Sequence, residues 1–235
     1  VDKNRPTTNK NTIIATGYNL LKIDKVDNQP ISGIIQKKIK DIILKEKADI
    51  VIFSDFRHGI FNKSSIPVLT SSVKRGIFKV ADSQVATRWG NITDFKNFDL
   101  ITPNEKEARF SLADQDASIS NLTQQLDKKI NSKNLILKLG ERGIFGQGKS
   151  NPHGFALPSF TKKIVDAVGA GDALLAYSSL ALRATKSILI SSILGSLAAS
   201  CECEKDGNIA IDPNEVNQKI KKLEESVNYS VISKI

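Results

Sequence analysis

A turn of small residues that ends in a carboxylate, Gly169-Ala170-Gly171-Asp172, has the clearest chemical potential in this sequence. The next five residues, 173–177, have the composition of a helix start. Backbone N–H groups at a helix start carry positive partial charge and lack acceptors, so they attract anions such as phosphate. A carboxylate there does not help to bind phosphate, but it can act as a base beside a reacting phosphoryl group. The turn therefore predicts phosphoryl transfer; the alternative is that Asp172 is an ordinary first-turn partner of the helix dipole.

Size and charge restrict the classes of protein that fit. With 235 residues and 40% hydrophobic residues, the chain can bury a sizeable core, and we expect one α/β domain. The net charge of +9 suits phosphorylated substrates and nucleotides, and it also suits nucleic acid. The lysines are scattered in short groups with few aromatic residues nearby, as at 37–38, 128–129 and 221–222. We therefore interpret them as solvated surface and expect no nucleic-acid partner.

Cysteine usage and hydropathy argue against a zinc site and a membrane segment. Cys201 and Cys203 lie two positions apart in an expected helix, so their side chains diverge by roughly 200° and cannot share one metal ion. The polar start, 1–6, is not typical of a signal peptide. The longest apolar stretch, 188–199, is shorter than the ~18 residues that span a bilayer. We expect a cytoplasmic protein with no membrane partner.

Apolar runs and helical patterns alternate along most of the chain. Strands are predicted at 12–15, 20–24, 49–53, 77–81, 98–101, 134–139 and 144–146, with a strand-like approach at 163–165. The first two would form a hairpin around 17–19. Helices are predicted at 31–46, 66–75, 121–130, 174–182, 186–203 and 213–226, the last with Asp212 as its N-cap, and a helix start at 105–107. This alternation predicts a mostly parallel sheet between helices, with ligands at the carboxyl ends of the strands.

Three segments in this order resemble the signatures of the PfkB/ribokinase family of carbohydrate kinases. They are Thr102-Pro103-Asn104-Glu105-Lys106-Glu107-Ala108, Leu139-Gly140-Glu141-Arg142-Gly143 and Asp166-Ala167-Val168-Gly169-Ala170-Gly171-Asp172. The resemblance covers essentially the whole chain. It implies a ribokinase-like three-layer α/β/α sandwich, with residues 1–235 as one kinase domain and 1–24 as a lid or hairpin.

Other segments are more particularly similar to kinase modules that act on D-glycero-D-manno-heptose 7-phosphate. They are 5–10, 20–24 and 54–59. The Gly-Gly segment of the family's amino-terminal part, with much of the sugar pocket, is not found in this sequence. We therefore expect the chain to be the carboxyl-terminal portion of such a domain.

The resemblance implies a role for each residue of the small-residue turn. Asp172 would be the general base that accepts the proton of the attacking sugar hydroxyl. The amides of Gly169, Ala170 and Gly171 would form the anion hole for charge that builds on the transferred group.

The family's Asn-x-x-Glu element is matched by Asn104 and Glu107, which would organise Mg²⁺ and its waters around the phosphates; the alternative is a simple helix cap. Asp166 matches a position that binds a monovalent cation such as K⁺ in many relatives, and a strand-end hydrogen-bond acceptor is the alternative. The nucleotide-side residues implied by the resemblance are Lys138, Gly140, Gly143, Gly207 and Asn208. Of these, Lys138 stands where relatives often carry a small hydroxyl residue.

Four further residues are candidate contacts of the sugar or its phosphate: Lys10, Asp55, Arg57 and His58. The alternatives are a surface turn for 55–58 and a solvated side chain for Lys10. Arg57 and His58 differ from the residues expected in heptose kinases, so the identity of the sugar stays open.

The resemblance as a whole implies a kinase that depends on ATP and Mg²⁺ and acts on a phosphorylated sugar such as a heptose 7-phosphate. A ribokinase-, fructokinase- or adenosine-kinase-like activity stays open. A catalytically silent module that binds nucleotide or sugar is the alternative from another class. Whether the protein forms a homodimer stays open.

Overall fold

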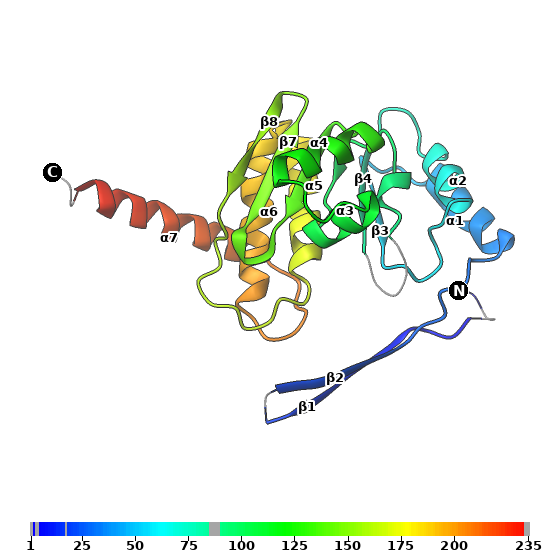
Figure 1. The fold of residues 1–235 in the computed structure, drawn as a ribbon, viewed down its shortest axis with the longest axis horizontal. Helices are drawn as coiled ribbons and strands as arrows, with labels where there is room; N and C mark the ends of the chain where they lie inside the picture. The colour runs from blue at the N-terminus through cyan, green and yellow to red at the C-terminus, as the bar shows by residue number, and fades with distance from the viewer. Residues whose placement is uncertain (1, 3–4, 17, 85–89, 233–235) are drawn as a thin grey trace.

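A six-stranded sheet in the order β3-β4-β5-β6-β7-β8 forms the centre of the computed structural model, which describes residues 2, 5–16, 18–84 and 90–232 (Figure 1). The strands are β3 (Ile50–Asp55), β4 (Phe78–Ser83), β5 (Leu100–Ile101), β6 (Asn134–Lys138), β7 (Ile144–Gly148) and β8 (Asn151–Leu157). Strands β3 to β6 pair parallel, and β7 and β8 join antiparallel, so β3 and β8 are the edges. The predicted mostly parallel sheet is confirmed.

Helices cover both faces of this sheet and complete a three-layer α/β/α sandwich. One face carries α1 (Gly33–Lys45), α2 (Ser65–Ser71), α3 (Glu105–Leu112) and α4 (Ile119–Ile130). The other face carries α5 (Ala170–Thr185) and α6 (Ile188–Cys203), and α7 (Pro213–Ile232) packs on α6 and extends away from the body (Figure 1). Asp212 accepts a hydrogen bond from the Asn214 N–H at 2.7 Å, which confirms the predicted cap of the last helix.

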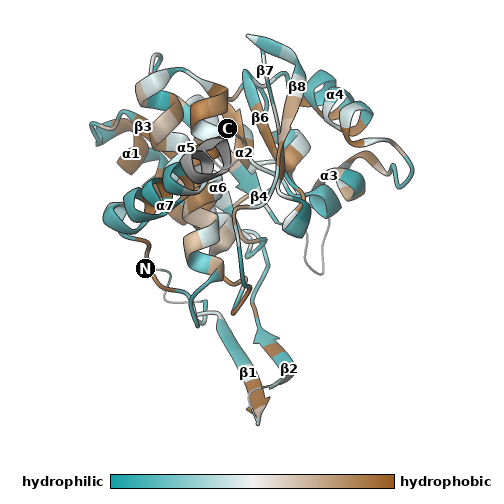
Figure 2. Cartoon of the chain, turned by 90° about the vertical axis from the view of Figure 1, so that its left-hand side faces the viewer, coloured by the Kyte–Doolittle hydropathy of each residue, from teal (hydrophilic) through white to brown (hydrophobic). Residues whose placement is uncertain are grey.

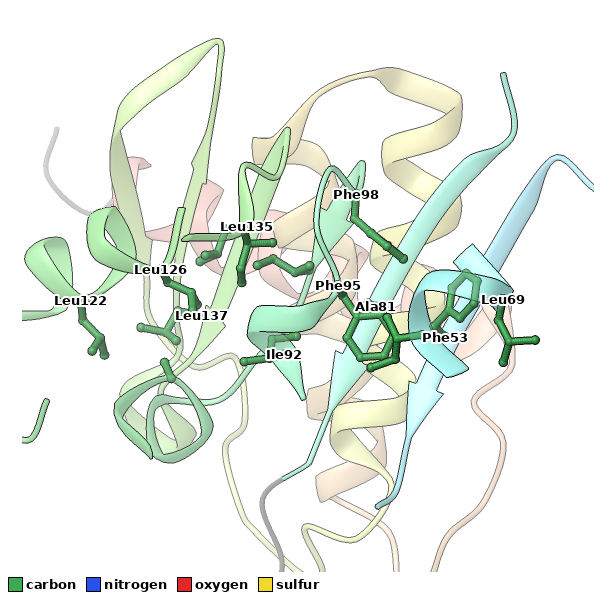
Figure 3. Packing of buried hydrophobic residues seen from close by; sticks show 14 residues of the cluster. Phe53, Leu69, Ala81, Ile92, Phe95, Phe98, Leu122, Leu126, Leu135 and Leu137 are labelled. Carbon is green, nitrogen blue, oxygen red and sulfur yellow. The ribbon is translucent and has the colours of Figure 1, made fainter. Parts of the chain in front are cut away.

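Aliphatic side chains and three phenylalanines fill the core between the sheet and the layer formed by α1 to α4 (Figure 3). Phe98 lies edge-on to Phe53, with 5.4 Å between ring centroids, and edge-on to Phe95, with 5.6 Å. All three rings are buried. This packing holds β3, β4 and the residues before β5 in register, so the polar residues at the carboxyl ends of β3 and β4 have fixed positions.

The predicted hairpin is present as an antiparallel ribbon of β1 (Asn9–Ala15) and β2 (Tyr18–Lys25), while Gly17, in its predicted turn, lies outside the described residues. The ribbon projects from the body and carries apolar residues that stay exposed, such as Ile14 and Leu20 (Figures 1 and 2). It is therefore held mainly at its base.

One side chain ties the base of the ribbon to the body. The Nη1 of Arg5 donates to the His58 carbonyl at 2.7 Å and reaches the Asp27 carbonyl at 3.5 Å, while its Nη2 donates to the Gln29 carbonyl. Arg5 precedes β1, whereas Asp27 and Gln29 follow β2. The guanidinium therefore joins both legs of the ribbon to the turn that follows β3.

One strand prediction is wrong, and one strand was not predicted. Residues 163–165 lie in a loop, where the N–H groups of Val165 and Asp166 donate to the Cys203 carbonyl at 2.8 and 3.3 Å. The strand β8 has no counterpart in the sequence prediction, because Pro152 and Gly154 interrupt its pattern. Such residues are tolerated in β8 because it lies at a sheet edge.

The lengths and hydropathies of the helices also bear on membrane insertion. Among the helices of the described residues, none is both long and apolar enough to cross a bilayer.

Candidate functional site

A cleft of about 680 Å³ opens at the carboxyl ends of the parallel strands, where the alternating pattern predicted ligands. We call it the strand-end cleft. It is lined from the ends of β4 and β6, the starts of α3 and α5, the loop before α5, and α6. Its lining includes these predicted site residues: Asn104, Glu107, Lys138, Gly140, Gly143, Gly169, Ala170, Gly171 and Asp172.

Asp172 stands in the first turn of α5, directly after the predicted small-residue turn. Gly169 is the N-cap of this helix, with φ 90°. A Cβ atom at Gly169 would lie 2.5 Å from both Asn208 Oδ1 and Glu202 Oε1, so only glycine fits here. The first amides of a helix have no acceptor in a preceding helical turn. Here the Ala170 N–H reaches the Ala167 carbonyl at a long 3.4 Å, and Gly171 shares the first turn of α5 with Asp172, at the positive end of the helix dipole.

A half-buried lysine lies among the acidic groups of the cleft. Lys138 Nζ contacts both carboxylate oxygens of Asp82, at 3.2 and 3.0 Å, and would lie 3.6 Å from a Cβ atom at Gly171. Burial by itself would lower the pKa of Lys138, but the charges of Asp82, Glu107 and Asp172 raise it above its usual value. Lys138 is therefore a firmly protonated cation at the floor of the cleft.

The Asp172 carboxyl binds protons more tightly than an exposed aspartate does. Burial raises its pKa, and the charge of Asp82 raises it further, while Lys138 and Lys10 act in the opposite direction. A carboxylate with a raised pKa is a stronger base than an ordinary aspartate. The geometry and the electrostatics of Asp172 thus both suit proton abstraction.

Asn104 and Glu107 form a reciprocal capping box at the start of α3. Asn104 Oδ1 accepts from the Glu107 N–H at 2.8 Å, and Glu107 Oε2 accepts from the Asn104 N–H at 2.6 Å. Burial raises the pKa of Glu107 to about 7, despite the lowering effect of Lys138. The structure therefore contains the cap that was the alternative to a magnesium role, and the same two residues line the cleft.

The nucleotide-side glycines occupy left-handed turns, with Gly140 at φ 63° and Gly143 at φ 90°. Both line the cleft, and the backbone of β8 and the following loop comes so close to Gly143 that it leaves no room for a side chain there. Gly207 and Asn208 are not part of the lining, although the Asn208 side chain touches the Gly169 turn. Asp166 accepts from the Val168 N–H at 3.0 Å, so one of its oxygens bonds within its own loop.

Asp55 is an internal residue and not part of a surface turn. It is 2% exposed, and its carboxylate accepts from Ser83 Oγ at 2.8 Å, Asn91 Nδ2 at 2.9 Å and the Arg57 N–H at 2.8 Å. Burial raises the pKa of Asp55 despite these bonds. Arg57 has φ 63°, a left-handed conformation that few side chains adopt, and its Nε is buried without a partner among the described residues. Through these hydrogen bonds, Asp55 stabilises the turn that follows β3.

His58 and Lys10 lie at the junction between the ribbon and the body. His58 Nδ1 is 3.4 Å from Thr8 Oγ1, and burial together with the charge of Lys10 lowers the pKa of His58. The same Lys10 lowers the pKa of Asp172. The structure thus places Lys10 within electrostatic range of both the base and the histidine.

Three residues of the site were not singled out from the sequence. Asp82, at the end of β4, forms the ion pair with Lys138. Ser196 and Ser200 of α6 line the cleft, and their buried hydroxyls have no partner among the described residues. Asp82 directly follows the predicted strand 77–81, and that position was the available signal. The two serines carry no such signal, because serine is common in α6.

Comparison with known proteins gives two kinds of match. The sequence model of the pfkB family of carbohydrate kinases matches residues 3–215. The bifunctional protein HldE of a Nitratiruptor species is 28% identical over 92% of this chain and 46% of its own length. HldE of Helicobacter pylori is 27% identical over 95% of this chain and 50% of its own length. The chain thus spans about half the length of these curated relatives.

Solved structures with the same fold include two sugar kinases. Phosphofructokinase-2 from Escherichia coli in complex with potassium has a TM-score of 0.72 and 19% identity, covering 87% of this chain and 67% of that one. Ribokinase from Thermotoga maritima has a TM-score of 0.69 and 22% identity, covering 92% of this chain and 70% of that one. At these identities the likeness shows the fold, which is the predicted ribokinase-like sandwich.

Proposed function

Since this chain belongs to the pfkB family of carbohydrate kinases, we propose that it transfers the γ-phosphoryl group of ATP to a hydroxyl group of a phosphorylated sugar, with Asp172 as the base. One observation carries the proposal: Asp172 lies at the amino-terminal end of α5 and lines the strand-end cleft, and its pKa is raised. A base and a set of anion-binding amides are thus next to each other.

The proposed reaction moves one proton and one phosphoryl group. The Asp172 carboxylate accepts the proton of the sugar hydroxyl as the hydroxyl oxygen attacks the γ-phosphorus. The bond from this phosphorus to the bridging oxygen breaks, and ADP leaves with that electron pair. The amides of Gly169, Ala170 and Gly171 stabilise the charge on the transferred group, and Lys138 holds a fixed positive charge beside them.

The charges of the cleft suit a nucleotide that carries Mg²⁺. Three carboxyl groups, those of Asp82, Glu107 and Asp172, act on a single lysine, Lys138, so negative charge is in excess. Among the described residues no three His, Cys, Asp or Glu side chains gather as a ready-made metal site. Asn104 and Glu107 would therefore hold the ion through its waters, as is usual for Mg²⁺ bound mainly by phosphates. When bound, the ion would neutralise phosphate charge.

Lys10 and His58 are the proposed contacts of the sugar's phosphate. Both lie at the base of the ribbon, within electrostatic range of each other, and Lys10 also acts on Asp172; a lysine beside a histidine suits an anionic substrate. A heptose 7-phosphate is the first sugar to test, because of the sequence resemblance and the HldE relatives. A K⁺ ion beside Asp166 and a homodimer also belong to the proposal.

The test measures ADP release against a panel of free and phosphorylated sugars, using the full-length gene product that contains these residues. Asp172→Asn keeps the size of the side chain but removes the base, so kcat should fall by roughly 10²- to 10⁴-fold while the affinity for ATP stays within about twofold. Asp41→Asn, a change of an exposed carboxylate on α1, is the matched control and should behave like the natural protein.

Two outcomes would overturn the proposal. Full turnover in Asp172→Asn would exclude Asp172 as the base. Tight ATP binding without turnover on any sugar would instead identify a silent nucleotide-binding module. Turnover on ribose or fructose but on no sugar phosphate would keep the kinase and remove the roles given to Lys10 and His58.

A further inference from the structure

A second cleft, of about 580 Å³, lies at the opposite end of the sheet from Asp172. We call it the basic cleft. It is formed by the residues before β4, the start of β6 and the carboxyl-terminal end of α5. Both β4 and α5 run from one cleft to the other: α5 begins at Ala170 in the strand-end cleft and ends at Thr185 beside the basic cleft. Its 16 residues separate the two clefts by roughly 24 Å.

Positive charge dominates the lining of this cleft. Six lining residues are cationic: Lys74, Arg75, Lys79, Lys133, Arg183 and Lys186. Among the described residues that line it, Asp99 is the acidic one. Cations crowded around a concave surface repel one another unless an anion lies between them.

Asp99 cannot serve as that anion, because both of its oxygens are already bound. Its Oδ1 pairs with Lys133 Nζ at 2.7 Å, and its Oδ2 accepts from the Lys79 N–H at 2.8 Å. Arg183 faces Asp49 at a long 3.8 Å. Lys133 thus has a close acidic partner, and Arg183 has a distant one.

Four cations of the basic cleft have no ion pair in the described part of the chain. One of them, Lys79, lies over the Phe98 ring, with its Nζ 5.1 Å from the ring centroid. The other three, Lys74, Arg75 and Lys186, are exposed. The negative end of the α5 dipole stabilises two positive charges of the cleft, since Lys186 is the C-cap of that helix and Arg183 lies in its last turn. It does not explain Lys74 and Arg75, which lie in the turn before β4.

The floor of the cleft is apolar. Ile77, Phe78 and Leu182 contribute to it, and Leu182 is 3% exposed. A volume of about 580 Å³ with an apolar floor and polar groups at the rim is typical of a small-molecule site. Single-stranded nucleic acid uses long grooves with several stacking rings, whereas the aromatic residue in this lining is Phe78.

We propose that the basic cleft binds a small organic molecule that carries two phosphate groups, at a site separate from the strand-end cleft. Three to four negative charges would neutralise the three cations without partners and the weakly paired Arg183. Each phosphate group carries about 1.5 to 2 negative charges, so two groups supply this number. The apolar floor accepts the carbon skeleton of the ligand, and the guanidinium of Arg75 can bind a phosphate through two parallel hydrogen bonds.

The test uses inorganic tripolyphosphate as the probe and follows backbone amide signals of the whole chain by NMR. We expect the amides of 74–79 and 183–186 to shift together with one dissociation constant. The double variant K74E/R75E should raise that constant by about tenfold or more, since it reverses two charges at the rim. K221E/K222E reverses two adjacent lysines on α7, outside the cleft, and should change it by less than about twofold.

The outcomes separate this site from the others. Shifts confined to residues around Gly169 would place the anion in the strand-end cleft and overturn the proposal. Equal weakening by both double variants would show a general effect of net charge and overturn it too. Tighter binding of a single-stranded RNA than of tripolyphosphate, lost in K74E/R75E, would identify a nucleic-acid surface instead. If K74E/R75E does not fold, K74Q/R75Q removes the same charges more mildly.

Discussion

At the scale of single residues, the site depends on one half-buried cation among several acids. Lys138 contacts Asp82 directly and acts electrostatically on Glu107 and Asp172. Without it, Glu107 and Asp172 would lose a positive charge that favours their ionised forms, so the pKa of each would rise further. Lys138 therefore keeps Asp172 ionised enough to act as a base, while burial keeps its pKa above the usual value.

Glu107 should make stability depend on pH in an uncommon direction. Its pKa is raised from 4.5 to about 7, so the folded chain keeps a proton that the unfolded chain releases. The free energy of unfolding should therefore fall as the pH rises from 4.5 to 7. Glu107→Gln keeps the cap and removes the titration, so urea unfolding should show a loss of stability across this window that is smaller by on the order of 2 kcal/mol.

Glu105→Gln, in the same helix, is the control. Burial alone would raise the pKa of Glu105, but Arg109 and Arg142 lower it below its usual value. Its contribution to stability is therefore lost as the pH falls below the usual range and should not alter the slope between pH 4.5 and 7. Identical slopes for the natural chain and Glu107→Gln would contradict the assignment.

Some residues of the site could be predicted from the sequence, and others could not. Asp172 and its turn were accessible, because the whole motif lies in four consecutive residues. The pair of Asp82 and Lys138 was not, since its members lie on different strands, 56 positions apart. The capping box of Asn104 and Glu107 was foreseen as an alternative, because its spacing of three is a local property.

At the scale of elements, the turn before α5 depends on the absence of a side chain at Gly169. Gly169→Ala adds a methyl group 2.5 Å from Asn208 Oδ1 and Glu202 Oε1 at φ 90°. We expect a loss of about 2 kcal/mol or more in stability from left-handed strain and crowding. The affinity for ATP should also fall, because the amides of the turn must move. Thermal unfolding and nucleotide binding would measure the two effects.

Gly171→Ala is the matched control for this turn. Its new Cβ atom would lie 3.6 Å from Lys138 Nζ, which is an ordinary contact, and alanine favours the helix. Its stability should be unchanged or higher. Equal losses in the two alanine variants would show that backbone flexibility, and not crowding at Gly169, maintains the turn.

Long elements were predicted well. The helix at 31–46 matches α1, because its apolar positions repeat along the helix, and the apolar stretch with small residues at 186–203 matches α6. The three apolar residues at 163–165 resembled a strand, but the loop satisfies its backbone through the Cys203 carbonyl instead. A run of only three apolar residues carries no period, so its tertiary partners decide its structure.

At the scale of the whole molecule, Arg5 controls where the ribbon stands. Its guanidinium joins both legs of the ribbon to the turn at His58. Arg5→Ala should release the ribbon and with it Lys10, so we expect the KM for the sugar phosphate to rise by roughly five- to tenfold. Because the ribbon contributes little to the buried core, the melting temperature should change by only a few degrees.

Lys22→Ala removes an exposed cation from the middle of the ribbon and is the control. It should leave both KM and the melting temperature near their natural values. A large fall in the melting temperature of Arg5→Ala, with KM unchanged, would show that Arg5 serves folding and not the position of the ribbon.

The exposed edge of the sheet has a consequence for how molecules of this protein meet each other. β3 has no strand on its outer side among the described residues, and Ile52 on it is 42% exposed. Parallel sheets are usually covered, and an open edge can pair with another chain. The net charge of +9 opposes such encounters, but about 0.1 M salt screens charge beyond ~10 Å. For the described part of the chain, attraction between exposed β3 edges should therefore be weaker in dilute electrolyte, where the net charge acts over a longer distance.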